Sequence, residues 1–166
     1  SRGLGDVYKR QPVVYPCNGI VAATFNKELC EYYGKQWGED GLWAGYAGLY
    51  GTGLNTHRSP YGGRNFEYYS EDPILGGVIA AEVSRGMSTR GVYSYLKHAF
   101  LNEQETYRID GFTWATEQSI REIYLKAFQI AIEEGGAQCI MSGLNNLGLI
   151  WTGSQGFIKN LSLIHI

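Results

Sequence analysis

Residues 72–98 read DPILGGVIAAEVSRGMSTRGVYSYLKH and contain one complete helix–strand unit. Asp72 beside Pro73 predicts the start of a helix, because aspartate caps a first turn and proline is tolerated there. We expect this helix to end at about Gly86. Residues 92–98 are rich in β-branched and aromatic side chains, which predicts a strand. A helix followed by a strand is the repeating unit of an α/β fold.

The same alternation continues on both sides of this unit. A helix over 26–44, capped by its first residue, and a short strand over 46–50 are expected before it. After it, we expect an amphipathic helix that Thr116 caps and Gly135 ends, and then a strand over 138–144. Such alternation predicts parallel strands joined by helices. The long loops follow the strands, as on the active face of a (β/α)8 barrel.

The chain has 166 residues, which suffices for one domain but not for a complete barrel of about 250. We therefore expect an α/β fold that is a partial (β/α)8 TIM-type barrel, truncated at both ends. Segments 1–11 (SRGLGDVYKRQ) and 161–166 (LSLIHI) resemble translated sequencing-adapter read-through, which is common at the edges of metagenomic genes. We expect them to be non-native tails around a barrel domain at 12–160. The alternative is a genuine, disordered N-terminus and a genuine C-terminal strand.

Composition excludes several classes of protein. Hydrophobic residues make up 44% and charged residues 18%, which is typical of a globular domain. The net charge of −2 argues against a nucleic-acid partner and against an anionic membrane. No apolar run is long enough to span a bilayer, and no leader pattern is visible. Cys17, Cys30 and Cys139 lack metal-ligand spacing, so we expect reduced cysteines, no metal and a cytoplasmic protein, with a fragment of an exported protein as the alternative. We expect no cofactor, since Gly51-Thr52-Gly53 lacks the rest of a dinucleotide-binding fingerprint.

A polar, glycine-rich stretch without periodicity, GTGLNTHRSPYGGRNFEYYSED, occupies residues 51–72. Loops of this length within a compact domain usually carry function. Arg64 is the strongest candidate in it, because a guanidinium offers a rigid fork of donors for two neighbouring hydroxyls or for a carboxylate. The alternative is structural: Arg64 would pair with Glu67 or Glu71 and brace the loop.

Lys97 and His98 stand where the strand over 92–98 ends. Adjacent residues of a regular strand point to opposite faces, so both side chains reach one ligand only if the backbone is distorted there. Otherwise one faces the barrel interior and the other a helix. Lys97 also permits a third interpretation, a Schiff-base lysine as in barrel aldolases, which requires a desolvated amine. Trp114 and Trp151 either stack on a sugar ring or pack against the protein.

These residues belong to stretches that follow one another in a recognisable order. The most specific stretch is GGRNFEYYSEDP at 62–73. The others are GED at 38–40, GLNTHR at 53–58, Lys97-His98 with Asn102 and Gln104-Glu105, TEQSIREIYLKAF at 116–128 and EEGGAQCIMS at 133–142. Over nearly all of 12–160, the chain resembles the N-terminal catalytic domain of glycoside hydrolase family 3, the β-glucosidase family.

The resemblance implies a barrel domain followed by a separate C-terminal domain of the same polypeptide. It implies a retaining, exo-acting β-glycosidase that hydrolyses terminal β-linked sugars, usually glucose, so that the partner is a carbohydrate substrate. In the resemblance, Arg64, Lys97 and His98 take the place of residues that hydrogen-bond the sugar hydroxyls in the −1 subsite. Glu67 takes the place of a brace for this basic cluster.

The resemblance also places the catalytic carboxylates outside this chain. In the family, the nucleophilic aspartate and the acid/base come from positions beyond the stretch that matches residue 160. We therefore assign no catalytic residue here and expect the fragment alone to be inactive. Leu144 stands where the family often has tyrosine or phenylalanine. A non-catalytic carbohydrate-binding homologue on the same scaffold is the alternative function.

Overall fold

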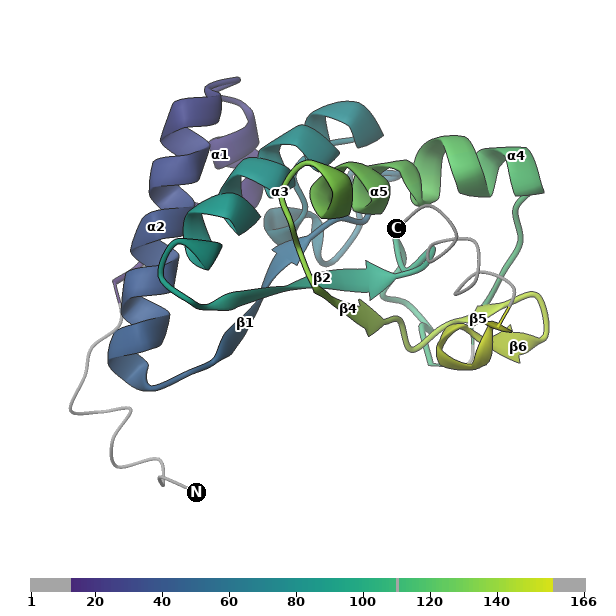
Figure 1. The fold of residues 1–166 in the computed structure, drawn as a ribbon. Coiled ribbons are helices and arrows are strands. Elements are labelled where there is room, and N and C mark those ends of the chain that lie inside the picture. Colours follow the sequence, from purple (N-terminus) through teal and green to yellow (C-terminus); the bar gives the residue numbers. More distant parts are fainter. Residues whose placement is uncertain (1–12, 110, 157–166) are drawn as a thin grey trace.

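A computed structural model describes residues 13–109 and 111–156 (Figure 1). Its centre is a parallel sheet of three strands in the order β1 (Gly48–Gly53), β2 (Tyr93–Ala99) and β4 (Cys139–Ser142). Parallel strands need crossover connections, and helices supply them, as the alternating pattern predicted. Segments 1–11 and 161–166 lie outside the described residues, so their assignment as non-native tails stays a prediction.

The helices cover one face of this sheet (Figure 1). They are α1 (Asn18–Ala22), α2 (Lys27–Ala44), α3 (Pro73–Ser88), α4 (Glu117–Ser119), a π-helical turn η3 (Ile120–Tyr124) and α5 (Lys126–Glu133). A small second sheet joins β3 (Phe112–Thr113), β5 (Asn146–Leu147) and β6 (Ile150–Trp151), and short 3-10 turns lie at Asn65–Glu67 and Thr152–Ser154. The main sheet and its helices thus form two layers.

Three polar side chains begin helices where the sequence predicted caps. Asn26, Asp72 and Thr116 each accept a hydrogen bond from a backbone N–H two or three residues ahead. Each of them thereby satisfies a donor that the start of a helix leaves unpaired. α2 ends at Ala44, as predicted, and is followed by Gly45 in the left-handed conformation at φ 77°. The starts of these helices and the end of α2 are therefore confirmed.

Some predicted boundaries differ from the structure. β1 spans Gly48–Gly53 rather than 46–50, because its pairing with β2 continues to its last residue and Thr52 is fully buried beside that strand. The strand expected over 138–144 is confined to the shorter β4. The helix expected after Thr116 is divided by the π-helical turn η3, where backbone hydrogen bonds join residues five apart in the chain instead of four.

Two glycines set the distance between α2 and α3. A Cβ atom at Gly34 would lie 2.1 Å from the carbonyl oxygen of Val83, and one at Gly86 would lie 2.2 Å from that of Glu31. Only a hydrogen atom fits between these backbones. The close crossing holds α3 against the sheet, where Val83 and Met87 are fully buried.

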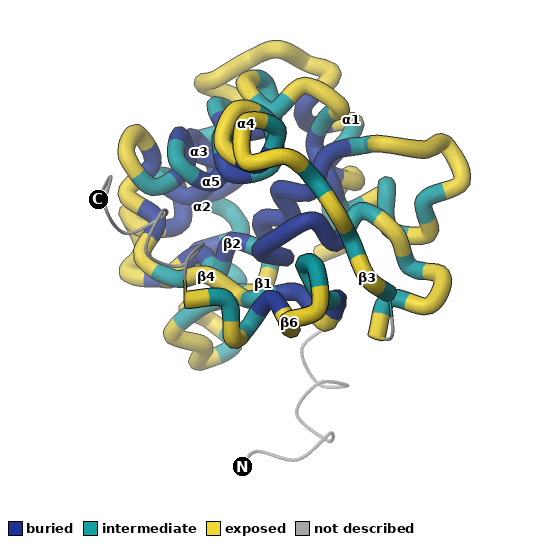
Figure 2. The backbone as a smooth tube through the Cα atoms, turned by 90° about the vertical axis from the view of Figure 1, so that its right-hand side faces the viewer, coloured by how far each residue is buried: buried dark blue, intermediate teal, exposed yellow. Residues whose placement is uncertain are grey.

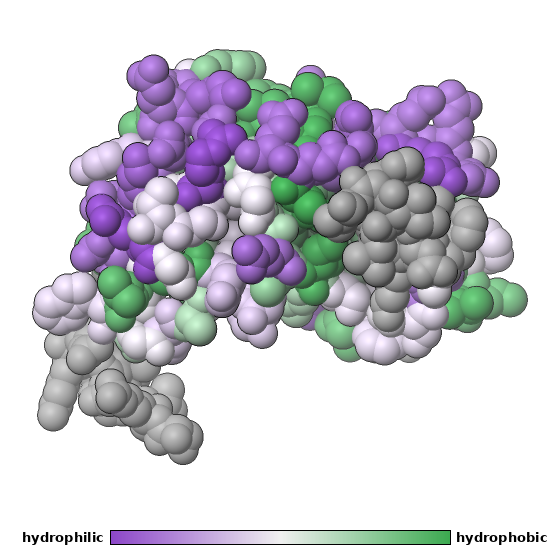
Figure 3. All heavy atoms as spheres, in the orientation of Figure 1, coloured by the Kyte–Doolittle hydropathy of each residue, from purple (hydrophilic) through white to green (hydrophobic). Residues whose placement is uncertain are grey.

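The core lies between this helical layer and β2 (Figure 2). Leu96 from β2, Ile79 from α3 and Phe128 from α5 are all nearly inaccessible to solvent. Figure 3 shows hydrophilic side chains over the helices in the upper half of the view, and less polar ones on the strand side below. The helices therefore shield the core, while the loops at the strand ends are left to form a site.

Replacing Gly86 with alanine should destabilise the chain, because the new methyl group meets backbone rather than a movable side chain. Overpacking of this kind costs about 1–3 kcal/mol. Gly76→Ala is the matched control in the same helix, since its Cβ atom would meet only the Cβ of Tyr69 at 3.9 Å. In urea titrations followed by circular dichroism, we expect a lower midpoint for G86A and an unchanged or higher one for G76A. Equal midpoints would contradict the close contact.

Candidate functional site

The predicted site residues gather where β1 and β2 end. A pocket of about 310 Å³ opens there, close to the smallest volume usual for ligand pockets. Arg64, Lys97 and His98 all line it, together with Tyr50, Asn102, Arg108, Met141 and Leu144. The structure thus brings the three predicted sugar-binding residues to one pocket, and their role in binding stays a prediction.

The backbone departs from regular strand geometry at Lys97 and His98. The register of β2 against β4 shifts between Lys97 and Ala99. Both neighbouring side chains line the same pocket, which a regular strand would not allow. The irregular backbone that the sequence required for a shared site is therefore present.

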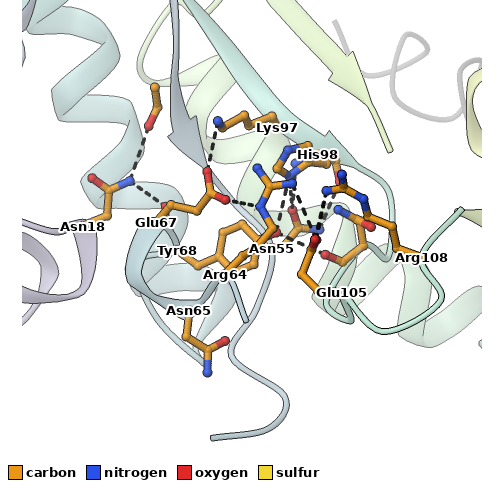
Figure 4. Close-up of polar contacts among 12 residues, drawn as sticks. Asn18, Asn55, Arg64, Asn65, Glu67, Tyr68, Lys97, His98, Glu105 and Arg108 are labelled. Atoms are coloured by element: carbon orange, nitrogen blue, oxygen red, sulfur yellow. Dashed lines mark hydrogen bonds and ion pairs between the residues drawn. The ribbon is translucent and has the colours of Figure 1, made fainter. Parts of the chain in front are cut away.

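Five charged side chains form a continuous series along the pocket, which we call the charge cluster: Lys97, Glu67, Arg64, Glu105 and Arg108 (Figure 4). The Lys97 ammonium lies 3.0 Å from one oxygen of Glu67, whose other oxygen contacts Nε of Arg64. Glu105 lies 3.6 Å from Arg64 and 3.0 Å from Arg108. Because opposite charges alternate, each cation is held by at least one carboxylate.

The loop that carries Glu67 is held close to the end of β1. A Cβ atom at Gly53 would lie 2.4 Å from the Glu67 carbonyl oxygen, so this approach requires glycine. The same carbonyl accepts a hydrogen bond of 2.6 Å from the Asn18 side chain. Nε2 of His57 donates to two further carbonyls of the loop, at 3.0 and 3.1 Å. Backbone contacts therefore fix the loop from which Arg64 and Glu67 project.

The charge cluster affects the protonation of Glu67 and of His98. Burial opposes ionisation of Glu67, but hydrogen bonds from Arg64 and Lys97 outweigh it, and the pKa of the carboxyl is lowered. Burial, reinforced by the charges of Arg64 and Lys97, lowers the pKa of His98 to about 4. At neutral pH Glu67 is therefore a carboxylate, whereas the His98 imidazole beside it is neutral.

The structural interpretation of Arg64 is correct in part. Its guanidinium braces the loop through Glu67, one of the two partners that the sequence offered, and also contacts Glu105. These contacts use Nε and one terminal nitrogen of a group that has five N–H donors. Bracing and ligand binding are therefore compatible, since Arg64 also lines the pocket.

Sequence reasoning missed Arg108 and Tyr50. Arg108 forms an ion pair with Glu105, three residues before it, across a turn that also joins their backbones. That short spacing of opposite charges was a usable signal. Tyr50 lies in the strand predicted over 46–50, yet it also lines the pocket and packs against Tyr95 at 4.7 Å between ring centres. Leu144 lines the pocket as well, so an aliphatic side chain stands where the family often has an aromatic one.

Neither of the two tryptophans singled out in the sequence lines this pocket. Nε1 of Trp151 donates to the carbonyl of Gly143 at 2.9 Å, so this half-exposed indole contacts the protein. Trp114 is 72% exposed and lines a separate cavity of about 650 Å³ together with Arg58 and Tyr124. The packing interpretation therefore describes Trp151.

Within residues 13–109 and 111–156, no three His, Cys, Asp or Glu side chains are grouped to hold a metal ion. No helix in the same part of the chain is long and apolar enough to cross a membrane. Cys17, Cys30 and Cys139 are free thiols. The cytoplasmic location stays a prediction.

Comparison with known sequences identifies the family. The chain matches the model for the glycosyl hydrolase family 3 N-terminal domain over residues 1–149. It is 40% identical over 134 residues to beta-glucosidase A of Butyrivibrio fibrisolvens, and 40% identical over 152 residues to a beta-glucosidase of Ruminococcus albus. These alignments cover 80% and 89% of this chain but only 16% of each relative.

Solved structures are similar as well. Beta-glucosidase 3B from Thermotoga neapolitana, in complex with α-D-glucose, gives a TM-score of 0.85 at 35% identity, over 90% of this chain and 22% of its own. A beta-glucosidase from Paenibacillus barengoltzii gives 0.82 at 38% identity, over 84% of this chain and 15% of its own. The expected α/β barrel-type fold is confirmed by these neighbours. The chain therefore belongs to glycoside hydrolase family 3 and lies within the N-terminal domain of that family.

Proposed function

We propose that this chain is part of a retaining, exo-acting β-glycosidase, and that its pocket is part of the −1 subsite, which holds the terminal sugar. The observation that carries the proposal is the convergence of Arg64, Lys97 and His98 on one pocket beside the charge cluster. The curated relatives are beta-glucosidases, and one similar structure holds glucose. Both facts support glucose as the sugar.

The pocket suits a neutral, hydroxyl-rich ligand. A sugar loses hydrogen bonds to water on binding, and each buried hydroxyl needs a replacement partner. Guanidinium and ammonium groups supply charge-assisted donors, and the neutral imidazole of His98 offers a ring nitrogen that forms a hydrogen bond with a hydroxyl. Because Glu67 and Glu105 nearly balance the three cations of the cluster, the pocket does not require an anionic ligand.

Each member of the site has a proposed role. Arg64, Lys97 and His98 hydrogen-bond the sugar hydroxyls, and Arg108 joins them because it lines the same pocket. Glu67 acts behind these residues, since its two carboxylate oxygens contact Arg64 and Lys97. Side chains held in this way bind a ligand with less loss of rotamer freedom than free ones.

We propose that the chain holds the sugar without cleaving it. A retaining glycosidase needs two carboxyl groups about 5–5.5 Å apart, one as nucleophile and one as acid/base. Glu67 and Glu105 are both engaged in ion pairs, and the lowered pKa of Glu67 makes it a poor proton donor. The nucleophile and the acid/base would then come from the rest of a longer polypeptide, together with a C-terminal domain.

The Schiff-base interpretation of Lys97 has less support. A Schiff-base lysine must present a free amine to a carbonyl carbon. The Lys97 amine instead lies 3.0 Å from the Glu67 carboxylate, within a series of alternating charges. This arrangement favours a lysine that donates hydrogen bonds over one that attacks a substrate.

Arg64→Ala should weaken the binding of D-glucose by about tenfold or more, because a hydrogen bond from a charged donor contributes about 1.5–3 kcal/mol. Arg121→Ala is the control, since Arg121 pairs with Glu117 on an exposed helical face away from the pocket. NMR titration with glucose measures both affinities. Equal affinities of R64A and R121A for glucose would contradict the proposal that Arg64 binds the sugar.

The wild-type chain should release no nitrophenol from p-nitrophenyl β-D-glucoside, even at concentrations where glucose binds. The physical reason is that the two carboxylates of the charge cluster, Glu67 and Glu105, are held by cations. Absorbance of free nitrophenol measures hydrolysis, and the same substrate with a family β-glucosidase provides the positive control. Steady release by the chain would show that its own carboxylates complete an active site.

His98 should stay neutral down to about pH 4, although an ordinary histidine titrates near 6.5. Because the pKa is lower in the folded chain than in the unfolded one, the stability that His98 contributes is present above pH 6.5 and is lost as the pH falls through 4. The imidazole C–H resonance measures the pKa, and His98→Gln should make the urea midpoint less sensitive to pH in this window. A pKa near 6.5 for His98 in the NMR titration would contradict this prediction, because it would show that the ring is solvated.

A further inference from the structure

The side chain of Asn55 forms hydrogen bonds with the backbone of His98, just beyond the point where the pairing between β1 and β2 ends. The pairing of β1 with β2 ends at Gly53 and Lys97. One residue further along β2, the His98 N–H donates to Oδ1 of Asn55 at 2.7 Å, and the His98 carbonyl accepts from Nδ2 of Asn55 at 3.0 Å. Asn55 is only 3% exposed. Its amide carries the same donor and acceptor as a peptide group and therefore substitutes for a neighbouring strand.

Glu103 fixes the direction in which this amide points. Its Oε1 accepts from Nδ2 of Asn55 at 3.2 Å and from the backbone N–H of Thr56 at 3.4 Å. A carboxylate only accepts hydrogen bonds, so it keeps Nδ2 on its own side and leaves Oδ1 for the His98 N–H. Burial raises the pKa of Glu103 to about 7, against the hydrogen bonds from Asn55 and Thr56, so the carboxylate form predominates above that pH.

The same amide oxygen also faces the imidazole ring. Nδ1 of His98 lies 3.3 Å from Oδ1 of Asn55 and 3.4 Å from the hydroxyl of Tyr68. The Tyr68 hydroxyl donates to the carbonyl of Asn102 at 3.2 Å, so its oxygen is available to accept from the ring. Two acceptors at Nδ1 favour the tautomer with its proton there, which leaves Nε2 as an acceptor for a ligand.

We propose that Asn55 and Glu103 are positioning residues: they hold the backbone at Lys97–His98 so that both side chains enter the pocket, and they keep the His98 proton on Nδ1. Neither Asn55 nor Glu103 lines the pocket, so both act through His98. The consequence for sugar affinity rests on the proposed function, whereas the effect on the imidazole does not.

The test compares Asn55→Ala, Glu103→Ala and Glu103→Gln in the full chain at pH 8, with Glu122→Ala as a surface control. Nitrogen NMR of the imidazole rings reports the His98 tautomer, and titration with D-glucose reports affinity. We expect N55A and E103A to lose the Nδ1–H signature and to bind glucose about tenfold more weakly, the loss expected for one or two buried hydrogen bonds. E103Q keeps an oxygen that accepts from Asn55 and should retain both properties.

An unchanged His98 tautomer in N55A and E103A would overturn the proposal. A changed tautomer with undiminished glucose affinity would overturn its functional half. If the wild-type chain itself binds no glucose while the tautomer changes as expected, the proposed sugar-binding function fails and the positioning contact stands. Should N55A not fold, E103A decides, because it removes one acceptor and leaves the Asn55 amide in place.

Discussion

Glu67 joins the two parts of the chain that carry the pocket. Its carboxylate contacts Arg64 on the loop after β1 and Lys97 near the end of β2. Without it, two cations would lie together in a half-buried pocket and repel each other. Glu105 repeats the arrangement between Arg64 and Arg108. The pocket therefore depends on carboxylates that both balance and orient its cations.

Three features of the backbone and its neighbours bring the charged side chains to one pocket. Gly53 lets the loop return beside β1, so that Glu67 reaches across to β2. Asn55 pairs with the backbone of His98 beyond the end of the β1–β2 pairing. The register shift after Lys97 then allows two consecutive side chains to share one pocket. Strand ends and loops, rather than the core, thus determine the chemistry of the site.

Much of the fold could be predicted from the sequence because its signals are local. Asn26 and Asp72 cap helices through hydrogen bonds within three residues, and such bonds leave a clear pattern. The bracing of Arg64 by Glu67 has the same short range. The place of Tyr50 at the pocket could not be predicted in this way, because it packs against Tyr95, far along the chain. The resemblance to a family supplied the roles proposed for the site residues, which spacing alone left open.

The most direct test of a sugar pocket built on this charge cluster is a crystal structure of the chain with D-glucose. We predict one glucose in the pocket at the ends of β1 and β2, with its hydroxyls within hydrogen-bond distance of Arg64, Lys97 and His98, and with Glu67 still between the first two. A pocket that stays empty at saturating glucose, or glucose bound only elsewhere, would contradict the assignment.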